Sequence, residues 1–302
     1  MEDLADIHTQ LSAIAQAVEY STIRFRQGEK AFYKLLNKSA SIRWAIPVNL
    51  DLPSQKVSLI VQSVLGSADI SWEGEAGKHR SQYTTETQII FKNIGSLIRC
   101  IIDCQIALGD SISIHSALML ERSLGARIWD DSPLQMKQIG SIGNVAVRKL
   151  VNAGLKSMED LEGCEPYRIE ALVGRNPPFG LDVLEKVRSF PKLRVSLQAQ
   201  PSTASLRSFF EVPVLTTMQA IKTHDGVKIQ IKADIGFINE QPPQRFNNKL
   251  IYVCLLVDTS DGRKVHFARI RWAITTSVLR CINPVAVAQS LGLAKASHSQ
   301  RS

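Results

Sequence analysis

The spacing of apolar residues changes once along this chain, near Leu193, and this change constrains the fold more than any other feature. Before it, apolar residues such as Leu4, Ile7 and Leu11 recur every three or four positions, the spacing of a helix with one buried face. After it, as in residues 227–232, apolar and polar residues alternate, which is typical of a half-buried strand. The sequence therefore predicts a multidomain protein, α first and β second.

Shorter-range patterns predict four segments. Residues 1–130 are expected to form a helical bundle, with helices beginning near Leu4, after Ser21, at Ser54, after a loop over 66–81, and at Ser111. Residues 131–192 predict a helix-hairpin-helix unit and following helices. Residues 193–271 predict a partial immunoglobulin-like β-sandwich, with strands at 207–220, 227–238, 250–257 and 264–271. We expect residues 272–302 to be a mostly irregular tail.

Several classes of protein are not supported by the residues present. Apolar runs are too short for a membrane-spanning helix, and the acidic start lacks the features of a secretory signal. Five scattered cysteines suit a reducing compartment, and Cys100 and Cys104 are expected to be buried. No phosphate-binding loop, zinc-ligand spacing or nucleophile elbow occurs. The sequence thus predicts no catalytic, ATP-binding or metal site in this chain.

The positive charge is unevenly distributed. The net charge is +8, and residues 196–302 carry 13 Lys and Arg against 6 Asp and Glu. A second basic stretch runs along the expected second helix. It contains Arg24, Arg26, Lys30, Lys34 and Lys38, and Glu29 is the only acid among them. Such surfaces suit nucleic acid or an acidic protein, although a run of charges is often only a solvated helix face.

One turn carries a more specific signal. In Ile139-Gly140-Ser141-Ile142-Gly143-Asn144 two glycines separate a predicted helix from the next. Without Cβ atoms the backbone can turn tightly and approach a phosphate, and the amides that begin the next helix would point at the anion. Such contacts carry no sequence information, and the alternative is a hairpin used only for packing. The candidate nucleic-acid-binding residues are Gly140, Ser141, Gly143, Asn144, Arg148 and Lys149.

The order of these segments resembles the C-terminal module of Ski-like superfamily-two helicases. The segments that carry the likeness are residues 17–30, 53–62, 128–135 and 189–195. Residues 261–270 make the chain most similar to the meiotic crossover helicases, which are ATP-dependent 3′ to 5′ DNA helicases. Related modules occur in a spliceosomal RNA helicase and in a translocation J-protein, so an RNA-remodelling or purely protein-binding role stays open.

The resemblance has several implications. A noncatalytic module would bind single-stranded or branched DNA through its bundle and hairpin, and recombination proteins through its β-domain, in the nucleus and without a membrane. ATP and Mg²⁺ would belong to motor domains that precede the module in the family. Two departures stand out: Lys137-Gln138-Ile139 replaces the family's Leu-Pro before the turn, and the alternation stops at Arg271. We therefore expect an incomplete β-sandwich, in either a fragment of a longer protein or an imperfect gene model.

Overall fold

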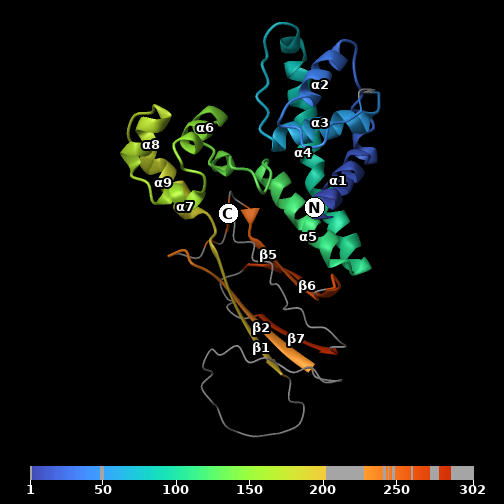
Figure 1. Ribbon diagram of the computed structural model, residues 1–302, viewed down its shortest axis with the longest axis vertical. Coiled ribbons are helices and arrows are strands. Elements are labelled where there is room, and N and C mark those ends of the chain that lie inside the picture. Colours follow the sequence, from blue (N-terminus) through green and yellow to red (C-terminus); the bar gives the residue numbers. More distant parts are fainter. Residues whose placement is uncertain are drawn as a thin grey trace. The chain divides into compact units, whose positions relative to one another are not determined.

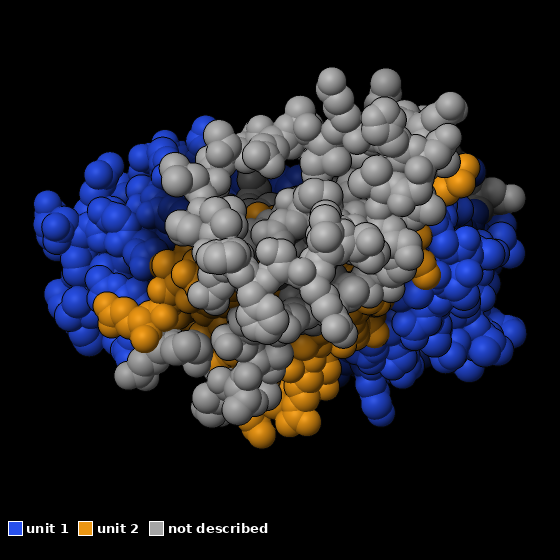
Figure 2. All heavy atoms as spheres, turned by 90° about the horizontal axis from the view of Figure 1, so that it is seen from below, with its two compact units in different colours: residues 1–188 blue, residues 189–302 orange. Residues whose placement is uncertain are grey.

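The computed structural model divides into two compact units, residues 1–188 and 189–302 (Figures 1 and 2). It describes residues 2–47, 51–201, 228–240, 243, 245–246, 249–259, 261–272 and 279–286. The predicted boundary between residues 1–130 and 131–192 falls inside the first unit.

The first unit begins with helices packed around a central one. They are α1 (Glu2–Ala15), the 3₁₀ turn η1 (Val18–Tyr20), α2 (Glu29–Asn37), α3 (Pro53–Leu65), α4 (Glu75–Leu108) and α5 (Ser111–Ala126). Helix α3 is central because Val57, Leu59, Ile60 and Val61 are fully buried in consecutive turns, as expected for a helix surrounded by others. Helix α4, which is 34 residues long, instead buries one stripe from Ile90 to Ile102.

Three expectations about this bundle were wrong. The second helix begins at Glu29 because Gly28 adopts a left-handed conformation with φ of 84°, so Arg24 and Arg26 precede the helix. Helix α4 begins at Glu75, inside the predicted loop. Cys100 and Cys104 are exposed, since they lie outside the single buried stripe of α4.

The hairpin region completes the first unit. Its elements are η2 (Gln135–Gln138), α6 (Asn144–Asn152), α7 (Met158–Glu162), α8 (Pro166–Val173) and α9 (Phe179–Ser189). Ser157 caps α7, and its hydroxyl accepts a hydrogen bond from the backbone amide of Asp160 at 3.0 Å. Gly180 lets α9 approach α8 closely, because a Cβ there would lie 2.2 Å from the carbonyl oxygen of Pro166.

The second unit is built from antiparallel strands. A three-stranded sheet has the order β1 (Leu193–Pro201), β2 (Lys228–Phe237), β7 (Leu279–Ala286), and two ribbons pair β3 (Arg245–Phe246) with β4 (Lys249–Leu250) and β5 (Tyr252–Asp258) with β6 (Lys264–Arg271). Ala233 and Ile235 of β2 share a core with Val253 of β5, which joins the sheet to a ribbon. Asn239 ties the ends of β1 and β2, because its side chain contacts the backbone of Phe190 and Lys192.

The α-then-β fold class is confirmed. Strands β2, β5 and β6 lie where alternation predicted them, whereas the strand expected at 207–220 lies outside the described residues. Strand β7 lies within the segment expected to be a mostly irregular tail, so at least one strand follows Arg271, where the alternation stops. Its sequence hides the strand, because it contains Pro284 and lacks clean alternation. No helix in the described ranges is long and apolar enough to span a membrane.

Candidate nucleic-acid interface

The hairpin at residues 139–143 is anchored by its two isoleucines. Ile139 and Ile142 are 1% and 2% exposed, and the amide of Ile142 donates to the carbonyl oxygen of Ile139 at 2.8 Å. Gly140 and Gly143 are both exposed. The isoleucines therefore hold the turn on the core, and the glycine backbone lies at the surface.

Neither glycine is required by the fold of the turn. Gly143 has φ of −82° and ψ of 169°, values open to any residue, and Gly140 is not among the glycines with positive φ. No described heavy atom lies within 4 Å of where a Cβ would be at either position. The expectation that these glycines permit the bend was therefore wrong. What their small size provides is an uncovered backbone.

The uncovered backbone includes the start of α6. Gly143 is the N-cap, and no described side chain caps the helix; the carbonyl oxygen of Gly143 accepts from Val147 at 3.0 Å. The amides of Asn144, Val145 and Ala146 have no acceptor within the helix, as in every helix start. Val145 is 69% exposed. The site thus offers amide donors and the positive end of a helix dipole to an anion.

Arg148 and Lys149 are one turn further along α6, and both already have contacts. Arg148 Nη1 lies 2.8 Å from Asp69 Oδ2, with side chains 41% and 80% exposed. Lys149 Nζ lies 3.4 Å from the carbonyl oxygen of Val173. A phosphate would have to draw Arg148 from Asp69, which a solvent-exposed pair allows because such pairs contribute little.

Sequence reasoning missed the loop that connects α3 to α4. Besides Asp69, this loop supplies Ser67, whose hydroxyl accepts from Lys137 Nζ at 3.0 Å. Burial, and secondarily the charge of Arg127, lowers the pKa of Lys137. No sequence signal links these residues to the hairpin, because they lie about seventy positions away from it. Ser141, also a candidate, has a buried hydroxyl without a hydrogen-bond partner among the described residues.

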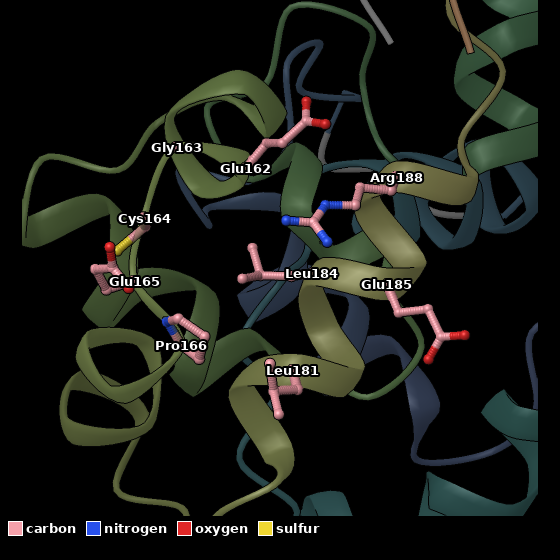
Figure 3. Close-up of a pocket in the computed structure, with 9 residues that line it drawn as sticks. All are labelled: Glu162, Gly163, Cys164, Glu165, Pro166, Leu181, Leu184, Glu185 and Arg188. Carbon is pink, nitrogen blue, oxygen red and sulfur yellow. The ribbon is translucent and has the colours of Figure 1, made fainter. Parts of the chain in front are cut away.

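A second turn, between α7 and α8, has the opposite character. It lines a cavity of about 500 Å³ together with α9, and the lining includes Glu162, Glu165 and Glu185 against one cation, Arg188. Figure 3 shows Leu184 and Arg188 directed toward this turn and Glu185 directed away. Carboxylates repel phosphate, so this turn is less suited to a polyanion than the glycine turn is.

Within the residues that the structure describes, no three His, Cys, Asp or Glu side chains come close enough to hold a metal ion. The fold and the site together define a helical module with an exposed glycine turn, followed by an antiparallel β-domain.

Comparison with known proteins agrees with this class. The chain belongs to the Sec63 Brl domain family, whose model matches residues 3–280. It is 28% identical over 192 residues to the ATP-dependent DNA helicase MER3 of Saccharomyces cerevisiae, covering 61% of this chain and 16% of that protein. It is 24% identical over 302 aligned positions to the MER3 homolog of Arabidopsis thaliana, covering 85% and 26%.

The relatives are much longer than this chain, which spans 16% and 26% of those two proteins. Another match, 26% identical over 194 residues, is the ATP-dependent RNA helicase DExH12 of Arabidopsis thaliana, of which the chain covers 8%. The chain is therefore related to a domain of ATP-dependent helicases, and its named DNA helicase relatives agree with the family likeness read from the sequence.

Proposed function

We propose that this chain is the noncatalytic accessory module of an ATP-dependent 3′ to 5′ DNA helicase that acts in meiotic recombination in the nucleus. In this proposal the hairpin grips the translocated strand, single or branched, and the β-domain binds recombination proteins. ATP and Mg²⁺ would act only in motor domains outside these residues.

The proposal rests on one observation. The start of α6 is exposed, no described side chain caps it, and it follows two glycines with no described heavy atom within 4 Å of a Cβ position. Three helix-start amides can each donate to phosphate oxygens, and Arg148 and Lys149 can add charge from the next turn. Because these groups contact the backbone and not the bases, binding would be independent of base sequence. A translocating motor needs that property, since it must hold every position of the strand in turn.

Replacement of Gly143 by Asp tests the hairpin. Aspartate is a favoured N-cap, and the space around Gly143 is open, so its carboxylate should accept the α6 amides and repel phosphate without harming the fold. Gly143→Ala is the matched control, because it fills the same space and leaves the amides available. Hydrogen bonds to a charged group contribute about 1.5–3 kcal/mol, so Gly143→Asp should weaken binding of single-stranded DNA roughly 10- to 100-fold.

The measurement is fluorescence anisotropy of a labelled mixed-sequence oligonucleotide with the full chain, together with urea unfolding of each variant. The expected result is weakened binding by Gly143→Asp and near-wild-type binding by Gly143→Ala. Both chains should stay folded, with stabilities within about 1 kcal/mol of the wild type, since aspartate is a better N-cap than glycine and alanine a poorer one. If both variants bind DNA as the wild type does, the hairpin is only a packing element and the proposed contact is wrong.

An RNA-helicase role is the alternative that a specific observation favours, namely the match to DExH12. Single-stranded RNA of the same sequence distinguishes the two proposals. A clear preference for RNA would assign the module to RNA remodelling. Absence of binding to either nucleic acid, at low as well as moderate salt, would instead favour a protein-binding platform such as the translocation J-protein relative.

A further inference from the structure

A second cationic surface lies on α2, away from the hairpin sequence. Lys30, Lys34 and Lys38 follow one another at four-residue steps and are all exposed, each about 6 Å further along the helix. The opposite side of α2 is buried through Phe32, Tyr33 and Leu36. The three lysines therefore line one outward side of the helix. Together with Arg26, exposed just before the helix, they are named here the α2 basic face.

Glu29, the one acid within the segment 24–38, does not neutralise this surface in the fold. Glu29 is 2% exposed, and its carboxylate lies 2.7 Å from Nζ of Lys56 in the interior. In the sequence, Glu29 is the only acid among the five cations. In the fold it faces inward, so the outward charge of this segment is entirely positive.

Most of the α2 basic face has no acidic partner. Lys30 forms an ion pair with Asp51, with both side chains about half exposed. Arg26, Lys34 and Lys38 form no ion pair with any residue that the structure describes. Unpaired cations on a surface attract a polyanion more strongly than cations already neutralised by a neighbour.

The first turns of α4 pack against the buried side of α2 and lie beside Gly28, just before the helix. The imidazole of His79 stacks near Phe32 of α2, with ring centroids 6.4 Å apart, and its Cε1 would lie 3.6 Å from a Cβ on Gly28. The start of α4 therefore runs beside the start of α2. Arg80 follows His79 and is exposed, and Glu73 and Glu75 of the same stretch are exposed too. This stretch therefore carries charges of both signs, and the α2 basic face depends on its own four cations.

We infer that the α2 basic face is a second nucleic-acid-binding surface, which holds the phosphate backbone through Lys34, Lys38 and Arg26 independently of the hairpin. Lysine is depleted at protein–protein interfaces, whose centres favour aromatic residues. The α2 basic face has no exposed aromatic residue, and the large apolar side chain beside it is Leu35, which is 71% exposed. Evenly spaced point charges match a polymer with a regular charge repeat better than they match an acidic protein.

The inference rests on the proposed nucleic-acid function and extends it to a second contact. Two contacts on one compact unit would give a longer grip on a strand or engage two arms of a branched substrate. Each contact would release counterions from the nucleic acid and so steepen the salt dependence of binding. The contributions of the two surfaces can therefore be measured separately.

The test compares two double variants of the full chain that each remove two exposed helical cations. Lys34→Gln with Lys38→Gln alters the α2 basic face, and Lys92→Gln with Arg99→Gln alters two exposed positions of α4 as the matched control. Affinity for a mixed-sequence single-stranded oligonucleotide is measured by anisotropy between about 50 and 200 mM salt. Circular dichroism and urea unfolding check that each variant folds as the wild type does.

The α2 variant should lower the slope of log affinity against log salt by about 1.4, since a single strand contributes about 0.7 per phosphate contact, and reduce affinity roughly 10- to 100-fold at 50 mM salt. The control variant and Gly143→Asp should both retain the contribution of the α2 basic face to the slope. An α2 variant with the slope of the control would overturn the inference while the hairpin proposal stands. A wild-type chain without salt-dependent binding would overturn both proposals.

A soluble polyglutamate peptide serves as the acidic-protein probe. If the α2 variant loses polyglutamate binding but keeps the wild-type slope on DNA, the α2 basic face binds acidic protein and the inference is wrong.

Discussion

Replacement of Lys56 by Met should lower the free energy of unfolding of the helical bundle more than replacement of any exposed charged residue does. The Lys56 side chain is fully buried, and its Nζ lies 2.7 Å from Glu29 and 2.7 Å from Glu86. It also donates to the carbonyl oxygen of Arg24 at 3.1 Å. This single ammonium therefore links the segment before α2, helix α2 itself and helix α4 to helix α3.

The magnitude follows from what would be left behind. Methionine fits the volume of the lysine stem, but two buried carboxylates would then face each other without a cation. Breaking a buried ion pair by removing one partner costs about 3–5 kcal/mol, and mutual repulsion of Glu29 and Glu86 places this case in the upper part of that range. Because whole domains are stable by about 5–15 kcal/mol, the loss is a large share of the total.

The assay is urea unfolding of the full chain followed by helical circular dichroism. Lys78→Met is the control, since Lys78 pairs with Glu75 at 2.6 Å on the surface, with side chains 67% and 84% exposed; its effect should stay within about 0.5 kcal/mol. Adding Glu29→Gln and Glu86→Gln to Lys56→Met should restore part of the loss, because no buried charge then remains. A loss below about 1 kcal/mol for Lys56→Met would refute the reasoning.

Three further predictions concern the hairpin region. Gly180→Ala should destabilise the chain in thermal unfolding by about 1–3 kcal/mol or more, because the new Cβ would meet the Pro166 carbonyl oxygen at 2.2 Å; unchanged stability would contradict the close approach. Hydrogen bonds from backbone amides and Ser157 lower the pKa of Asp160. The ionised Asp160 should therefore stabilise α7 at pH values above the pKa of this group in the unfolded chain, and the stabilisation should disappear as the pH falls through the lower pKa of the folded chain. Acid unfolding of an Asp160→Asn chain should lack this pH dependence. Asp69→Asn should raise affinity for single-stranded DNA by up to about fivefold, since it frees Arg148 from a surface pair of about 1 kcal/mol or less; weaker binding would mean that the pair positions the hairpin.

Much of the fold follows from local spacing. Helices α1, α3, α5 and α6 and strands β2, β5 and β6 lie where periodicity and turn residues indicate, because each depends on neighbours in sequence. The start of α4 and strand β7 were missed, since Glu75–Ser81 contains Gly77 and β7 contains Pro284. Tertiary contacts override such weak local preferences. Exposure of Cys100 and Cys104 was missed because helical spacing alone does not reveal which side of α4 is covered.

The position of the candidate interface was likewise predictable, but its electrostatics were not. By itself the sequence determined where the glycine turn lies, which helix start follows it, and which segments are rich in lysine and arginine. Only the tertiary structure decided which of those charges are available. It buries Glu29 against Lys56, pairs Arg148 with Asp69, and leaves Lys34 and Lys38 open, because coulombic interaction and desolvation depend on distance in space and not on separation along the chain.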